Sequence, residues 1–294
     1  MTMRTLPVSM LATVSVLGTA GLTTAHAWSE LTDHSTTQST LHFAGTGPHT
    51  LEIRTITGRI SVEAYDGSDV QMTVDKTVYA DTKEELEAAK REVVLDVGDN
   101  AASVGAIVKY PGQNACGDEY SGSHHDWHHH YDVRYDFTVK VPRNTRVELC
   151  TVNDGKVEVT GTQGDFDIHS INGHITLTDV SGSGDAMTIN GPVTASFVKS
   201  PQGKSTFKTI NGEVSVTFPQ DLSADLRLKT FNGGLYTDFD VTQQGAITNV
   251  TREKRGGMSV YRTTGYTSVR VGNGGPELTL QSLNGDVRVI RRSK

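Results

Sequence analysis

The sequence predicts an all-β protein in which short copies of one repeat stack into a solenoid. Three observations predict this class: a recurring Asn-Gly turn, alternating apolar and polar residues around it, and a second glycine-containing turn between copies. Each rung then has roughly two strands and two corners, and the stacked rungs form two facing sheets over a thin core. A thin core agrees with a composition of only 35% hydrophobic and 6% aromatic residues.

The repeat is visible in seven stretches of the chain that fit one template. Residues 51–62 and 166–177 align without a gap, whereas the copy at 149–159 carries one extra residue at its turn. Successive asparagines from 172 onward are separated by 18, 21 and 21 residues, a period typical of solenoids. Asn-Gly supplies the positive φ angles of tight turns, and the turn residues of the regular copies are Gly58, Asn172, Gly173, Asn190, Gly191, Asn211, Gly212, Asn232, Gly233, Asn284 and Gly285.

Three positions of the template, each at a fixed distance before the Asn, carry the same type of residue in the different copies; we call each such position a column. Apolar residues stand four positions before it and again immediately before it, the second set being Ile171, Ile189, Ile210, Phe231 and Leu283. Two positions before it the residue is always hydroxylic: Thr55, Thr151, Ser170, Thr188, Thr209, Thr230 and Ser282. A small hydroxyl at a corner can bond to backbone or to its counterpart in the next rung, so we expect stacked Ser/Thr and Asn ladders along one edge. A ligand-binding ridge is the alternative.

Other segments interrupt the repeat. Residues 81–94 predict a helix with Asp81 as N-cap and Glu84 completing a capping box, and this helix should cover an end or side of the sheets. Polar, Gly-rich residues between 237 and 278 leave room for a long excursion. Residues 111–131 form a loop.

Residues 1–27 have the pattern of a secretory signal peptide. Arg4 precedes an apolar run, and Ala25-His26-Ala27 is a small-x-small cleavage site. The run is too short and too rich in Thr, Ser and Gly for a good membrane span, although an uncleaved anchor is the alternative. We therefore expect one mature repeat domain, 28–294, with an N-terminal part at 28–140, a main repeat stack at 141–294 and no transmembrane segment.

Two cysteines, Cys116 and Cys150, suit an exported protein with one disulfide, the alternative being two separate thiols. The bond would join the root of the 111–131 loop to the first complete rung of the main stack. It would therefore hold the loop near the start of that stack.

The 111–131 loop contains a candidate metal site. Five of the 11 histidines lie within seven residues, and the candidate ligands are His124, His125, Asp126, His128, His129 and His130. Imidazole suits Zn, Ni and Cu, yet no spacing typical of a known metal motif fixes the geometry. An exposed polar loop that picks up metal adventitiously is the alternative, and we expect no resident cofactor.

Two further classes of function find less support. Asp165, Asp167, Asp179 and Asp185 could form carboxylate pairs for glycoside chemistry, but they occupy outward strand positions and turns, where Asp is ordinary. The net charge of -7 disfavours nucleic acid as a partner, since phosphate binding needs clustered Lys and Arg. The sequence therefore predicts a protein that is not an enzyme.

The Thr-Ile-Asn-Gly-x-Val-x-Val unit and the closing segment from Gly274-Gly275-Pro276 to Asn284-Gly285 resemble the bacterial putative-adhesin family of β-strand-repeat proteins, whose domain has no known function. The resemblance covers roughly residues 40–294. It implies an exported, non-catalytic protein in the periplasm, at the cell surface or outside the cell. Such a protein would act as an adhesin-like scaffold for an unknown envelope or surface component. The alternatives are an exported metal-binding protein that uses the His-rich loop and a glycan-active β-helical enzyme.

Overall fold

A computed structural model describes residues 31–43, 45, 47–99, 102–111, 116, 131–244, 250–255, 258–263 and 265–293. The predicted all-β, solenoid-like class is confirmed, with most of the described residues in strands and α1 as the one helix of the described ranges. The predicted leader at 1–27 lies outside these ranges. Among the described residues, no helix is both long and apolar enough to cross a membrane.

The chain divides into two compact units, unit 1 at residues 1–158 and unit 2 at residues 159–294. The boundary falls within strand β9 (Val157–Thr160). The other elements of unit 1 are β1 (Leu31–His42), β2 (Thr50–Arg54), β3 (Ile60–Tyr65), β4 (Asp69–Ala80), α1 (Lys83–Glu92), β5 (Val94–Asp99), β6 (Ser103–Lys109), β7 (Tyr131–Pro142) and β8 (Arg146–Thr151).

Unit 1 combines two repeat copies with long antiparallel strands. Strand β2 pairs in parallel with both β8 and β6, and β3 pairs in parallel with β7. The 12-residue strands β1, β4 and β7 then pair antiparallel to one another in that order. Unit 1 differs from the predicted stack of two-strand rungs. Between β3 and β8 the chain adds strands that pair both parallel and antiparallel, instead of adding further rungs.

Helix α1 packs against β1, β4 and β7. It begins one residue later than predicted, since Thr82 is the N-cap and Glu85 completes the capping box. Thr82 Oγ1 accepts the Glu85 N–H at 3.2 Å, and Glu85 Oε2 accepts the Thr82 N–H at 3.0 Å, so the reciprocal pair satisfies two helix-end donors. The helix ends at Glu92 because Val93 is extended and leads into β5.

Unit 2 consists of rungs and an antiparallel addition. Its elements are β10 (Phe166–Ser170), β11 (Ile175–Val180), β12 (Gly184–Met187), β13 (Val193–Phe197), β14 (Ser205–Lys208), β15 (Val214–Phe218), β16 (Ala224–Lys229), β17 (Leu235–Thr237), β18 (Val241–Gln243), β19 (Val250–Arg255), β20 (Met258–Thr263), β21 (Thr267–Val271), β22 (Glu277–Gln281) and β23 (Val287–Arg291). The excursion expected between 237 and 278 contains a separate β19–β20 hairpin and two strands, β18 and β21, which pair antiparallel and extend the sheet beyond β16.

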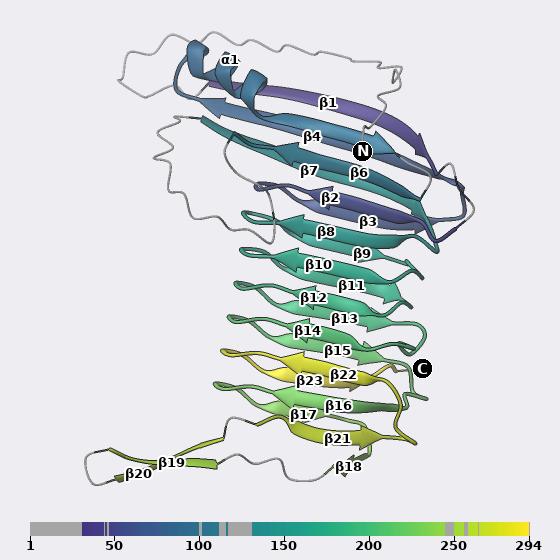
Figure 1. Ribbon diagram of the computed structural model, residues 1–294, viewed down its shortest axis with the longest axis vertical. Coiled ribbons are helices and arrows are strands. Elements are labelled where there is room, and N and C mark those ends of the chain that lie inside the picture. Colours follow the sequence, from purple (N-terminus) through teal and green to yellow (C-terminus); the bar gives the residue numbers. More distant parts are fainter. Residues whose placement is uncertain are drawn as a thin grey trace. The chain divides into compact units, whose positions relative to one another are not determined.

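The rungs of unit 2 do not stack in sequence order. In one sheet the order is β10-β12-β14-β22-β16, and in the other it is β11-β13-β15-β23-β17. The last repeat copy, β22 and β23, therefore lies between the β14/β15 rung and the β16/β17 rung, where Figure 1 shows yellow strands flanked by green ones. All pairings between these neighbouring rungs are parallel, for example Phe207 with Leu280 and Val216 with Val289. The register of β11 with β13 shifts between Leu177 and Val180.

The core of unit 2 lies between its two sheets. Phe166 and Phe207 come from one sheet, Phe197 and Phe218 from the other, and all four side chains are fully buried. The Phe197 ring meets Phe207 edge-on with centroids 5.9 Å apart and stacks on Phe218 at 5.2 Å. Burial of such a side chain contributes roughly 1.5–3 kcal/mol, so a few aromatics hold a thin core together.

Candidate binding surfaces

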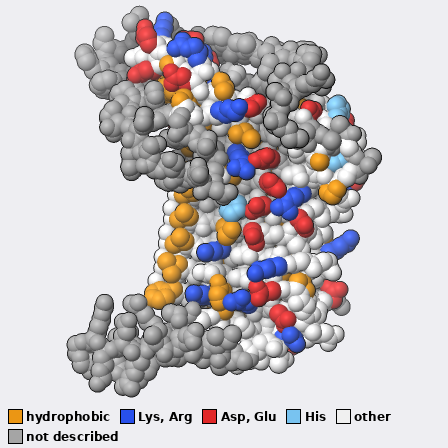
Figure 2. Space-filling view, in the orientation of Figure 1, with side chains coloured by type: hydrophobic (Ala, Val, Ile, Leu, Met, Phe, Trp, Pro, Cys, Tyr) orange, Lys and Arg blue, Asp and Glu red, His pale blue; other side chains and the backbone are white. Residues whose placement is uncertain are grey.

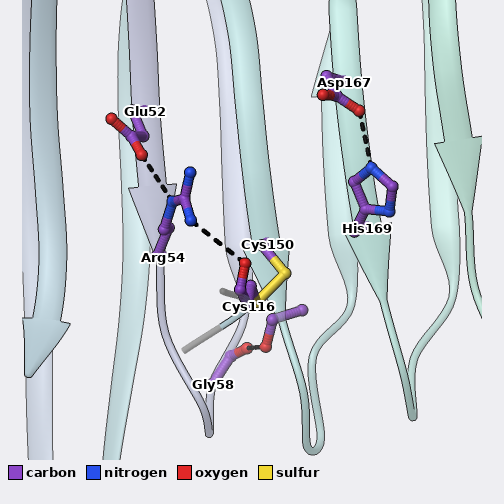
Figure 3. Close-up of a disulfide and its surroundings, with 8 residues drawn as sticks. Glu52, Arg54, Gly58, Cys116, Cys150, Asp167 and His169 are labelled. Carbon is purple, nitrogen blue, oxygen red and sulfur yellow. Dashed lines mark hydrogen bonds and ion pairs between the residues drawn. A yellow bond between two sulfur atoms is a disulfide. The ribbon is translucent and has the colours of Figure 1, made fainter. Parts of the chain in front are cut away.

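The predicted disulfide is present and joins Cys116 to Cys150 of β8, with their Cα atoms 6.1 Å apart (Figure 3). Arg54, which lies beside Cys150 on the neighbouring strand β2, donates from Nη1 to the Cys116 carbonyl at 3.2 Å. Its Nε donates to Glu52 Oε1 at 2.6 Å, which fixes the guanidinium against the strand. The bond and this contact together hold the residue at the root of the 111–131 loop.

The candidate metal ligands His124, His125, Asp126 and His128–His130 lie outside the described residues. Within the ranges that the structure does describe, no group of three or more His, Cys, Asp or Glu side chains is placed to hold a metal ion. The metal site therefore stays a prediction.

The Asn-Gly turns of unit 2 form a continuous edge with an asparagine ladder. Asn190, Asn211, Asn284 and Asn232 each donate from Nδ2 to the Oδ1 of the preceding asparagine, beginning with Asn172, and each of these four distances is 2.7 Å. The ladder follows the spatial order of the rungs and not the sequence order. It places a row of uncharged amides at solvent.

The hydroxyl column behind this ladder does not bond to itself. Thr188 donates to the Gly173 carbonyl at 2.9 Å, and Thr209 donates to the Gly191 carbonyl at 2.8 Å. The same bond is made by Ser282 to Gly212 at 2.8 Å, by Thr230 to Gly285 at 2.7 Å and, in unit 1, by Thr151 to Gly58 at 3.0 Å. These five hydroxyls thus satisfy the turn carbonyl of the neighbouring rung, which is a structural role and not an exposed ridge. Thr55 instead donates to the Thr57 carbonyl of its own turn, and the buried Ser170 hydroxyl has no partner among the described residues.

The turn glycines are required by stacking as well as by conformation. At Gly285, where φ is +157°, an added Cβ would lie 1.9 Å from the Gly212 carbonyl oxygen of the next rung. At Gly212, with φ +155°, it would lie 2.3 Å from the Gly191 carbonyl oxygen. No side chain fits where two backbones approach this closely.

The two apolar columns of the template differ in burial. The residues four positions before each Asn are buried, among them Ile168, Phe207 and Leu280. Of the residues immediately before each Asn, Ile171 is half-buried and the other four are exposed, with fractions of 39% for Ile189, 36% for Ile210, 43% for Leu283 and 60% for Phe231. Alternation could not distinguish the two columns, because the strand ends between them and the turn directs the second column outward.

We call these four exposed side chains, in the order Ile189, Ile210, Leu283, Phe231, the turn-edge ridge. Figure 2 shows hydrophobic side chains in a line along one edge of the rungs. Neighbouring strands are about 4.8 Å apart, so the ridge extends over about 14 Å beside the asparagine ladder. Exposed apolar side chains in a contiguous row, next to uncharged amides, are typical of an interaction surface.

The candidate catalytic carboxylates lie on the open surface of unit 2. Asp167 and Asp185 are neighbours on β10 and β12, and Asp167 Oδ1 lies 2.8 Å from His169 Nε2 (Figure 3). Asp165 Oδ1 accepts the Ser183 N–H at 2.9 Å, while Asp179 pairs with an arginine near the C-terminus. The four carboxylates therefore do not converge on one site, and their contacts are those of turns and strand faces.

Comparison with known proteins finds a family model that matches part of the chain. Residues 144–270 match the model of the Toastrack family, DUF4097, which confirms the predicted resemblance to a domain of unknown function; the match ends before the last repeat copy. Two solved structures are similar, each at 8% identity. One is a putative cell adhesion protein from Clostridium sporogenes, with a TM-score of 0.42 and coverage of 88% of this chain and 100% of that one. The other is a putative adhesin from Bacteroides fragilis, with a TM-score of 0.26 and coverage of 90% of this chain and 98% of that one. No curated protein matches the chain.

Proposed function

We propose that this protein, whose residues 144–270 match the Toastrack model, is an exported, non-catalytic scaffold of the cell envelope or cell surface. It binds an envelope or surface component along the turn-edge ridge. The observation that carries this proposal is the row of exposed Ile, Leu and Phe side chains on an edge whose asparagine amides bond to one another.

The ridge is suited to binding because it is rigid and uncharged. The asparagine ladder and the hydroxyl-to-glycine bonds fix each turn to the next, so little conformational entropy remains to be lost when a partner docks. Burying amides that bond to one another costs less than burying charged groups, and each apolar side chain removed from water stabilises the complex. Core packing of unit 2 does not need these side chains, since its aromatic core lies between the sheets.

The test is cosedimentation of residues 28–294 with envelopes isolated from the source bacterium. A quadruple variant, Ile189→Thr, Ile210→Thr, Leu283→Thr and Phe231→Thr, should lose at least about tenfold in affinity, because it removes apolar area worth more than 1.4 kcal/mol. The matched control carries Val198→Thr and Val241→Thr, which are exposed to 44% and 42% elsewhere in unit 2, and should bind as the wild type does. Equal binding by the ridge variant and the control would exclude the ridge as the contact surface.

A second candidate function is transition-metal binding by the His-rich loop. It is supported by five histidines within 124–130 and by the disulfide that holds Cys116 at the loop's root. Calorimetric titration of residues 28–294 with Zn, Ni and Cu should give whole-number stoichiometry if this function is correct. A variant with His124, His125, His128, His129 and His130 changed to Ala should then lose the heat, whereas variant-independent or unsaturable heat would reject a specific site.

A further inference from the structure

The outer face of β17 and β23 in unit 2 contains a shallow depression of about 400 Å³. Its outward side chains are Tyr236 and Asp238 at the sheet edge and Arg288 and Ile290 on the neighbouring strand. Ligand sites of small molecules have volumes from about 300 to 1,000 Å³, so the depression is large enough for one ring-sized group. Neither the repeat template nor the family match assigns a role to it.

Tyr236 forms an aromatic wall of this depression. Its side chain is 49% exposed, and the guanidinium carbon of Arg288 lies 4.4 Å from its ring centroid. The hydroxyl end of the ring lies against Gly234, where an added Cβ would come within 2.4 Å of the Tyr236 oxygen. The ring is thus held in place while much of it remains open to solvent, as in an aromatic platform with an apolar body and a polar tip.

The charges around the depression favour a neutral ligand. Arg288 is already paired, with Nη2 at 2.5 Å from Asp286 Oδ2 and Nε at 3.1 Å from Glu213 Oε2. Asp238 adds a third carboxylate, and its Oδ1 accepts the Arg291 backbone N–H at 2.7 Å. An anionic ligand would meet these carboxylates, whereas a neutral polyhydroxyl ligand can both donate to carboxylate and accept from guanidinium.

The depression continues into two rows of small hydroxyl side chains across the same face. Strand register places Thr176, Thr194 and Ser215 in line with Arg288 and Tyr236, and it places Ser196 and Thr217 in line with Ile290. These hydroxyl side chains are exposed or half-exposed. They repeat at the strand spacing of about 4.8 Å and present donors and acceptors without charge.

We infer that this face binds a neutral, extended polysaccharide that crosses the strands. One sugar ring occupies the depression with its C–H face on the part of the Tyr236 ring that Arg288 leaves open, and the following sugars contact the hydroxyl rows. The inference goes beyond the proposed function, because it uses the outer face of a sheet and not the turn-edge ridge. Either surface can therefore fail its test independently of the other.

Isothermal titration of residues 28–294 with two neutral probes, cellohexaose and N-acetylchitohexaose, tests this inference, with polygalacturonate as the anionic probe. At least one neutral hexasaccharide should bind saturably, and polygalacturonate should bind more weakly. Tyr236→Ala should weaken binding about tenfold, whereas Tyr236→Phe, which keeps the ring, should remain within about twofold of wild type. The control variant Val94→Thr, which changes an exposed side chain of unit 1, should bind sugar unchanged.

Melting curves of the variants separate binding from folding, and since Tyr236 is half-exposed at a sheet edge, Tyr236→Ala should fold. Absence of saturable heat with both neutral hexasaccharides would overturn the inference. So would tighter binding of polygalacturonate, or wild-type affinity in Tyr236→Ala. Loss of sugar binding in Tyr236→Phe as well would reject the stacking geometry.

Discussion

The two units use the same strand-turn-strand copies but support them differently. In unit 2 each rung has another rung as its neighbour, and asparagines, hydroxyls and glycines align from turn to turn. In unit 1 the β2/β3 copy has a repeat copy on one side only, and Thr57 pairs with Asn153 where the asparagine ladder would run. Long antiparallel strands and a helix support the other side, while the disulfide joins Cys116 to Cys150 of the neighbouring copy. A repeat with no further copy to stack on is thus supported by antiparallel strands instead.

The largest expected effect comes from removing the last repeat copy. Truncation after Gly274 deletes β22 and β23, which pair with β14 and β15 on one side and with β16 and β17 on the other. In hydrogen exchange, β16 and β17 should then lose protection, while β10 to β13 keep it. A stack in sequence order would lose only its end rung, so continued protection of β16 would contradict the inserted arrangement.

The next largest effect is a loss of stability in unit 1 that unit 2 should not share. Replacing Cys116 and Cys150 by Ser opens a link across 34 residues of sequence, which on the chain-entropy model removes about 4 kcal/mol from the free energy of unfolding. Urea unfolding followed by hydrogen exchange should show the loss in β8 and β2 and little change in β14. Reduction of the wild type should reproduce the shift, and a change below about 1 kcal/mol would show that the antiparallel strands alone support this unit.

A pair of glycine substitutions compares a glycine packed against the backbone of the next rung with a glycine that has open space beside it. Gly285→Ala in unit 2 should cost about 3 kcal/mol or more, because its Cβ meets a carbonyl oxygen at 1.9 Å and φ is +157°. Gly98→Ala in unit 1 is the control, since no atom lies within 4 Å of the added Cβ, and it should change stability by less than about 1 kcal/mol. Thermal unfolding of both variants measures the difference, and equal losses would contradict a packing role for the turn glycines.

The smallest effect is a pH dependence in unit 1. Burial opposes ionisation of Asp136, but hydrogen bonds from Arg134 Nε at 2.9 Å and from the Arg59 N–H at 2.8 Å outweigh it, so the pKa of Asp136 lies below its ordinary value. A lowered pKa in the folded state stabilises the protein above the unfolded value of about 3.9, and this contribution is lost as pH falls through the folded pKa. Asp136→Asn should cost about 1–2 kcal/mol at pH 6 and less at pH 3.

The matched variant for this titration is Asp225→Asn in unit 2. The hydrogen bond from Arg270 Nε, 2.6 Å from Asp225 Oδ1, also lowers the pKa of Asp225, but both side chains are more than a third exposed. Solvent screening should make its pH dependence smaller than that of Asp136. A larger effect at Asp225 would reverse the comparison between the units.

The sequence predicted more of the local structure than of the order in which the rungs stack. The Asn-Gly turns, the buried column represented by Ile168 and Phe207, and the Cys116–Cys150 bond all follow from residue type and spacing. The helix was displaced by one residue, because Asp81-x-x-Glu84 and Thr82-x-x-Glu85 are both capping patterns and only the second forms the reciprocal pair. The exposure of Ile189 and Phe231 could not be predicted, because the alternation of apolar and polar residues indicates burial only within a strand and not at a turn.

By itself, then, the sequence determined what a rung is: two short strands, a glycine turn that permits close backbone approach, and side chains that complete the turn of a neighbour. Only the tertiary structure decided which rung neighbours which, and it placed the last copy between two earlier ones. The physical reason is that copies of one template present nearly the same hydrogen bonds and apolar faces, so local sequence does not select a partner. The chain enters β22 from β21, which pairs antiparallel with β16, and β22 then pairs with the other edge of β16. This order sets the order of the turn-edge ridge and brings Tyr236 beside Arg288.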